Sequence, residues 1–304
     1  LYGRNANAGV VNVITKQPGN KREGYVSLEL GNLGQKRLDG AVNLPFNESL
    51  ALRAAFSTNR RDGYSETKTA ANGFSENQDS IHTDSVRLQA LVKFNARNSL
   101  TLSYDQSNNK TTGPNYYDLT NGGIPTKLVD PNVLIQGRFD NTLSGYRAEL
   151  KSDLGFAALN YLYGHRETKN KEDYSTGPVI LLTKFKFKQD SHELRLSSND
   201  AKSALQWVTG LFLYKETGTD GQLDGNLPPF LSFLYPFPVG APLGANQCGG
   251  FTAGCYPFVQ FIDNLVTSES KAVFGQVTYS LSDTSRVIAG ARYTRDEKHR
   301  SGFG

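Results

Sequence analysis

Hydrophobic and polar residues alternate along most of this chain with a period of two. In the stretch Val86–Phe94 (VRLQALVKF), most alternate side chains are apolar and those between them are mainly polar or charged. Such alternation is typical of β-strands with one face in an apolar environment. It predicts an all-β chain with eleven strands: Val26–Leu30, Leu38–Leu44, Leu50–Ser57, Val86–Phe94, Leu100–Asp105, Tyr146–Leu154, Phe156–Gly164, His192–Ser198, Leu205–Tyr214, Val273–Leu281 and Val287–Thr294.

The connections between these strands alternate in length. The short turns are Pro45–Ser49, Ala96–Ser99, Asn199–Ser203 and Ser282–Ser285. The long connections span about Arg61–Ile81, Asn109–Leu143, Thr168–Lys184 and Thr217–Ser268. Tight turns at one end and long loops at the other are typical of outer-membrane β-barrels. A soluble domain seldom contains structureless loops of this length.

The alternation also predicts how the side chains face. Leu88 and Ala90 share one face of their strand, whereas Arg87, Gln89 and Lys93 share the other. A basic side chain that faces lipid at mid-bilayer costs about 2–4 kcal/mol, so in a membrane barrel the charged set must line the lumen. A soluble β-sandwich with its charges in water would alternate in the same way. Periodicity alone therefore leaves both architectures open.

The first eighteen residues, LYGRNANAGVVNVITKQP, resemble the closing segment of the plug domain in TonB-dependent outer-membrane receptors. The matching positions are Leu1, Tyr2, Gly3, Gly9, Asn12, Thr15, Lys16 and Pro18. In that family, this segment lies inside the barrel and leads into its first strand. Two later passages resemble hairpins of the same family: Lys188–Ser198 with Leu205–Glu216, and Lys271–Lys298 with its Gly290, Arg292 and Tyr293.

The resemblance implies that residues 1–20 end a plug domain and that residues 21–304 form the first half of a barrel of 22 strands. The chain contains no methionine, so we expect a fragment of a longer protein. The family implies a place in the outer membrane of a Gram-negative bacterium, surrounded by lipid. It also implies active uptake of a ferric siderophore, energised by the TonB complex through a segment absent here. Cobalamin, haem or a saccharide is the alternative substrate. A plugless porin, an outer-membrane enzyme and a soluble adhesin are weaker alternatives.

Composition narrows the remaining functions. The 33 basic and 29 acidic residues give a net charge of +4, and the basic residues are scattered, which does not favour nucleic-acid binding. No apolar run reaches the 18 residues of a membrane helix. The four histidines lack metal-site spacing, and no nucleophile motif or phosphate loop is present. We therefore expect neither an enzyme nor a bound metal or cofactor.

Aromatic and cationic residues in the second long connection are candidate substrate contacts: Tyr116, Tyr117, Arg138 and Phe139. Aromatic rings and arginine suit planar or catecholate ligands. The alternatives are packing within the loop and the aromatic girdle that membrane barrels carry.

Two cysteines lie in the longest connection, within QCGGFTAGCY. Cys248 and Cys255 are seven positions apart, and the glycines between them allow a close approach of the two Cα atoms. A loop outside the cell is reached through an oxidising compartment, where disulfides persist. We predict a Cys248–Cys255 disulfide; two free thiols or a metal pair are the alternatives.

Overall fold

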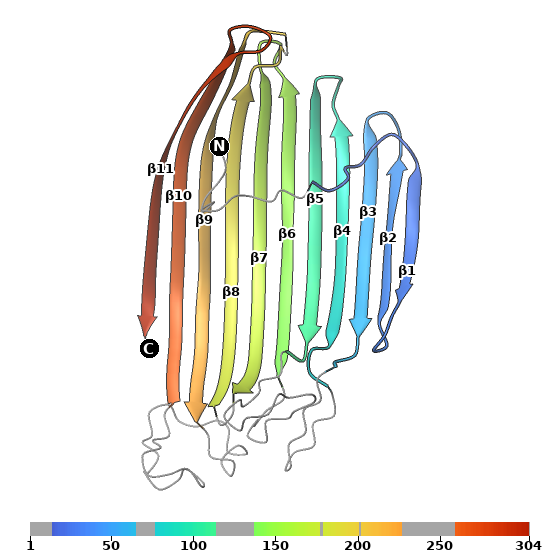
Figure 1. Cartoon of the computed structure of the whole chain (residues 1–304), viewed down its shortest axis with the longest axis vertical. Helices are drawn as coiled ribbons and strands as arrows, with labels where there is room; N and C mark the ends of the chain where they lie inside the picture. The colour runs from blue at the N-terminus through green and yellow to red at the C-terminus, as the bar shows by residue number, and fades with distance from the viewer. Residues whose placement is uncertain are drawn as a thin grey trace.

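The computed structural model describes residues 14–64, 77–113, 137–176, 179–200, 202–226 and 259–303. Within these ranges, eleven antiparallel strands form one sheet in chain order (Figure 1). The strands are β1 Glu23–Leu30, β2 Lys36–Pro45, β3 Leu50–Arg61, β4 Ile81–Lys93, β5 Asn98–Thr111, β6 Arg138–Asp153, β7 Ala158–Thr176, β8 Val179–Ser197, β9 Leu205–Asn226, β10 Val259–Ser280 and β11 Arg286–Phe303. All eleven predicted strands are confirmed, and their short-turn ends agree with the prediction to within two residues. In the described ranges, no helix is long and apolar enough to cross a membrane.

Five short connections join the strands at one end of the sheet, the upper end in Figure 1. In each connection, a side-chain oxygen near the start accepts a hydrogen bond from at least one main-chain N–H group two or three residues later. Asn47 Oδ1, for example, accepts from the N–H groups of both Ser49 and Leu50 at 2.8 Å. The corresponding residues of the other turns are Asn95, Asp153, Asp200 and Ser282. Side chains of this type stabilise tight turns locally, so the sequence itself specifies these reversals.

The opposite end of the sheet differs from the predicted loops. Thr168–Lys184 is not a long loop, because β7 continues to Thr176 and β8 begins at Val179. Likewise, β9 extends to Asn226, β10 begins at Val259 and β6 begins at Arg138. In β7 and β9 these extensions carry mostly polar residues on both faces, so they lack the apolar alternation on which the prediction relied. In β8, Phe185 and Phe187 do alternate with lysines, and the prediction overlooked that signal. The hydrogen-bonded ladder of β7 and β9 continues without the alternation.

The two faces of the sheet can be told apart by the segment before β1. Gln17 of this segment receives a hydrogen bond from Gln89 of β4, so we call the face that carries Gln89 the inner face. The register carries this face across neighbouring strands, since Gln89 lies opposite Arg53 and Ser103, and Ser103 lies opposite Arg147. At this level, the predicted lumen face is thus polar across β3 to β6.

The outer face is apolar and exposed over the half of the sheet nearest the short turns. We call this surface the apolar band; its exposed side chains include Leu52, Phe56, Val86, Leu88, Leu102, Tyr104, Leu211, Leu213 and Val273. Buried hydrophobic residues in the described ranges are few and mostly small: Ala41, Ala51, Ala157, Ala272 and Phe274. A soluble sandwich would cover its apolar face with a second sheet. The described residues instead expose theirs, as a strand wall facing lipid does.

Candidate functional site

The segment Ile14–Arg22 lies against the inner face, and it contains three residues of the motif described above. Lys16 forms an ion pair with Glu23 at the start of β1, and the Arg53 guanidinium lies 3.7 Å from the same carboxylate. Pro18 is buried. The motif residues Thr15, Lys16 and Pro18 therefore belong to a short strap that turns from the inner face into the first strand.

Asn43 of β2 is the main anchor of this strap. Its carboxamide accepts a hydrogen bond from the N–H of Gly19 at 3.0 Å and donates to the carbonyl oxygens of Gly19 and Lys21 at 2.8 and 2.5 Å. The Asn43 side chain is only 1% exposed. Because a buried carboxamide without partners is costly, these bonds fix both the side chain and the strap.

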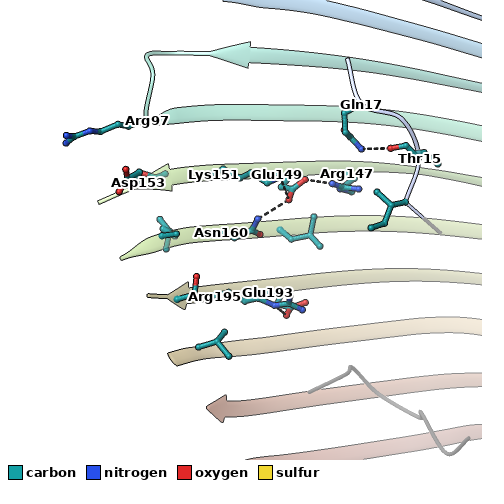
Figure 2. Close-up of a pocket in the computed structure, with 17 residues that line it drawn as sticks. Thr15, Gln17, Arg97, Arg147, Glu149, Lys151, Asp153, Asn160, Glu193 and Arg195 are labelled. Atoms are coloured by element: carbon teal, nitrogen blue, oxygen red, sulfur yellow. Dashed lines mark hydrogen bonds and ion pairs between the residues drawn. The ribbon is translucent and has the colours of Figure 1, made fainter. Parts of the chain in front are cut away.

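A cavity of about 870 Å³ opens on the inner face, between the strap and strands β6–β9. Figure 2 shows Thr15 and Gln17 on the strap, crossing over the strands that carry the charged lining. The Glu149 carboxylate is paired with Arg147, accepts a hydrogen bond from Asn160 at 2.9 Å and lies 3.4 Å from Lys151. The wall of this cavity thus combines apolar side chains with charged ones, and several of the charges are paired with one another.

A second polar feature lies on the inner face toward the long-connection end. One residue from each of seven strands stands at the same level of the register. We call these residues the polar row: Asn59, Thr83, Asn109, Asn141, Asn170, Asp220 and Asn264. Phe185 of β8 occupies the same level between Asn170 and Asp220. Five of the seven polar side chains are carboxamides, which both donate and accept hydrogen bonds.

Several atoms of the polar row have no partner among the described residues. They are buried side-chain atoms: Asn59 Oδ1, Asn141 Oδ1, Asn170 Oδ1, Asp220 Oδ1 and Asn264 Nδ2. Buried polar atoms are nearly always hydrogen-bonded to protein or to water in folded proteins. Four of these five atoms are oxygens, so the polar row would accept hydrogen bonds from water or from the O–H and N–H groups of a ligand on the inner face.

An aromatic pair lies directly beyond the polar row. Phe139 of β6 stacks on Tyr174 of β7, with ring centroids 5.6 Å apart and planes inclined by 20°. Phe139 is two residues from Asn141 on the same strand, so it also faces inward. Arg138 is its neighbour in β6 and therefore projects from the outer face, where it is exposed. The two residues that the sequence grouped together thus lie on opposite sides of the sheet.

The fold of the chain is similar to that of several solved structures. Neither a protein-family model nor a curated protein matches it. The ferric yersiniabactin uptake receptor from Yersinia pestis matches with a TM-score of 0.77 at 15% identity, over 100% of this chain and 44% of that chain. The fold is that of an outer-membrane receptor barrel.

Two other solved structures agree. The ferric citrate transporter in its unliganded form has a TM-score of 0.70 at 11% identity, covering 99% of this chain and 42% of that chain. The ferripyoverdine receptor of the Pseudomonas aeruginosa outer membrane has a TM-score of 0.65 at 12% identity, covering 95% and 38%. The chain thus spans 38–44% of the length of these receptors.

Some of the predicted residues lie outside the described part of the chain. They are the motif residues Leu1, Tyr2, Gly3, Gly9 and Asn12, the loop tyrosines Tyr116 and Tyr117, and the cysteines Cys248 and Cys255. Their roles remain predictions.

Other residues of the inner face were missed by sequence reasoning. Asn43, Tyr174 and the polar row sit in strands whose polar positions look alike in sequence. Only the register between strands brings these side chains to one level, and a single sequence does not display that register. For Asn43, a polar residue in the otherwise apolar VNLP stretch was the available signal.

Proposed function

We propose that this chain forms part of a TonB-dependent receptor in the outer membrane of a Gram-negative bacterium, which takes up a ferric siderophore. Residues 1–20 are the end of its plug domain, and residues 21–304 are the first half of its barrel. The observation that carries the proposal is the strap: residues with the family's plug-exit motif lie on the inner face and are bound there by Asn43 and Glu23.

The inner face supports uptake of a polar ligand. The aromatic pair Phe139–Tyr174 and the polar row lie at the end of the sheet where the long connections emerge, and the strap lies toward the other end. A ligand captured at the long-connection end would meet rings first and then hydrogen-bonding groups. A siderophore with planar surfaces suits the rings, and its N–H or O–H donors suit the unpaired oxygens of the polar row. The role is transport, with no catalytic step assigned to any residue.

The experiment that tests this function is energised uptake in whole cells. Iron-starved cells that carry the full-length gene are given a panel of ⁵⁵Fe-labelled siderophores, with a gene deletion and a TonB deletion alongside. We expect uptake of at least one ferric complex that requires both genes and stops on addition of a protonophore.

Other results would assign a different function. Uptake confined to cobalamin, haem or a saccharide would keep the receptor and replace the substrate. Uptake of the labelled complex that persists both without TonB and in the presence of the protonophore would indicate a porin and contradict active transport.

A further inference from the structure

The outer face carries a cluster of lysines on two adjacent strands, just beyond the apolar band. We call it the lysine patch: Lys169 and Lys171 on β7, with Lys184, Lys186 and Lys188 on β8. All five side chains are exposed. The register sets Lys169 directly opposite Lys186 and Lys171 directly opposite Lys184. Two successive cross-strand pairs thus bring like charges together, which destabilises a sheet unless an anion lies between them.

The depth of the lysine patch follows from the rings beside it. Tyr146 stacks on His165 at 4.7 Å, and Tyr163 packs against His192 at 4.9 Å between centroids. These rings lie on the outer face at the edge of the apolar band, where membrane barrels carry their aromatic girdle. On the same face of β7, the residue that follows His165 toward the long connections is Glu167, and the one after that is Lys169. The lysine patch therefore lies at the level of lipid head groups on the long-connection side.

The carboxylates that face the lysine patch neutralise it only in part. Glu167 lies 3.0 Å from Lys169 and 3.8 Å from Lys186, and Asp173 pairs with Lys171. Asp140 stands opposite Lys171 in the register, and Asp190, one row nearer the apolar band, is bound to Tyr163 and His165. Five lysines against Glu167, Asp173 and Asp140 leave a net charge of +2.

The lysine patch is also concave. A cavity of about 410 Å³ is lined by Asp140, Thr142, Lys169, Lys171, Lys184 and Lys186, among others. Ammonium groups around one hollow form charge-assisted hydrogen bonds to the oxygens of a phosphate group. Thr142 adds a hydroxyl at its edge.

We propose that the lysine patch binds the phosphorylated head group of a glycolipid in the outer leaflet. This inference rests on the proposed function, because it requires the apolar band to face lipid. The lysine patch adjoins the apolar band on the same face, so a ligand whose acyl chains lie along the apolar band brings its phosphates to the lysines. A soluble phosphate lacks that anchorage. The inner face, where a transported ligand would pass, lies on the other side of the sheet.

The experiment measures lipid binding by the full-length, delipidated protein in detergent, using native mass spectrometry. The probes are diphosphoryl lipid A, the same lipid without its phosphates, and inorganic phosphate. The test variant is Lys184→Gln/Lys186→Gln. Near an anionic membrane surface, each lysine contributes about 1 kcal/mol, so the loss of both should weaken binding of diphosphoryl lipid A about 30-fold. The dephosphorylated lipid should bind weakly to wild type and variant alike, and millimolar phosphate should not compete.

The matched control is Lys36→Gln/Arg60→Gln. These two basic residues lie opposite each other on the outer face near the same end of the sheet, but they are on β2 and β3, with β4, β5 and β6 between them and the lysine patch. The control should bind diphosphoryl lipid A within about twofold of wild type, because the charge removed is the same and only its place differs. Equal loss in both variants, or equal binding of the dephosphorylated lipid, would overturn the proposal.

If inorganic phosphate competed with diphosphoryl lipid A, the hollow would be a site for a soluble anion and the lipid proposal would be overturned. Heat-modifiable migration in gels is recorded for every variant, because it reports a folded membrane barrel. If it is absent from the wild type, the proposed function fails; if it is present while lipid binding ignores the lysine patch, only this inference fails.

Discussion

Asn43 holds Gly19 by both of its main-chain groups, accepting from its N–H at 3.0 Å and donating to its carbonyl oxygen at 2.8 Å. One side chain on β2 therefore fixes the orientation of the main chain on both sides of Gly19, 24 residues earlier. A carboxamide is suited to this task because it donates and accepts side by side. The strap consequently has a defined path on the inner face.

Asn43→Ala should release the strap. Removal of its hydrogen bonds is expected to weaken docking by about 2 kcal/mol, or about 30-fold in the opening equilibrium. Trypsin cleavage at Lys16 and Lys21 in the folded protein measures the opening. Asn47→Ala is the control, because Asn47 bonds only its own turn and should leave this cleavage unchanged. Equal cleavage in the two variants would show that Asn43 does not hold the strap.

Leu102 and Ser103 provide a direct test of the two faces. They are neighbours in β5, and Leu102 is 44% exposed on the outer face whereas Ser103 faces inward, opposite Gln89. Leu102→Arg should reduce folding stability in bilayers by about 2–4 kcal/mol, and Ser103→Arg by much less, because only the first places a charge in lipid. Refolding titrations of the full-length protein into vesicles compare the two. A larger loss for Ser103→Arg would reverse the assignment of the faces.

Phe139 and Arg138 should differ in their effect on ligand binding. Phe139→Ala removes the ring stacked on Tyr174, and an aromatic contact contributes about 0.5–1.5 kcal/mol, so affinity for the transported complex should fall by about 2- to 12-fold. Arg138→Ala should have little effect, since this side chain points away from the inner face. Equilibrium binding of the labelled complex to outer membranes gives both values. The reverse order would place the ligand outside the inner face.

Asp79 predicts a pH-dependent local stability near the long connections. Burial raises the pKa of this carboxyl above its ordinary value of 3.8, although a hydrogen bond from Tyr64 and the charge of Arg61 oppose the shift. The folded state therefore disfavours the ionised form, and the carboxyl reduces local stability as pH rises through its pKa. Asp79→Asn removes the charge and tolerates the left-handed φ of 64°.

The measurement for Asp79 is hydrogen exchange of its own N–H, which donates to the carbonyl oxygen of Gly113 at 2.8 Å. The Asn variant should be better protected than wild type at neutral pH and equal to it at about pH 3, where both side chains are uncharged. Better protection of the wild type at neutral pH would contradict the direction of the shift.

The sequence predicts the strands and their faces well because lipid imposes a strict rule on them. Near the short turns, every second residue must be apolar, and Leu88 and Gln89 obey this requirement without reference to any neighbour. Beyond the apolar band, the β7 part of the stretch from Thr168 to Lys184 is mostly polar on both faces, so it reads as a loop although it forms strand. There, hydrogen bonding between main chains sustains the structure without any pattern of side chains.

The candidate site is less accessible to sequence reasoning. Asn141 and Asn170 are 29 positions apart and stand opposite each other only because β6 and β7 pair in one particular register. Arg138 and Phe139 are adjacent and for that reason face opposite ways. Proximity in sequence was therefore a poor guide to the inner face, whereas the strap motif with Thr15, Lys16 and Pro18 is a local feature that can be recognised without knowing the register.

The extension of β9 from Leu205 to Asn226 has a mechanical consequence. Its 22 residues reach roughly 70 Å along the strand, more than twice the roughly 30 Å thickness of a bilayer core. Continuous ladders join it to β8 and β10 over nearly this whole length. The part of β8–β10 that extends beyond the bilayer core is therefore a continuously hydrogen-bonded sheet and should be stiff. A force applied at its outer edge would tilt these strands together, with little bending.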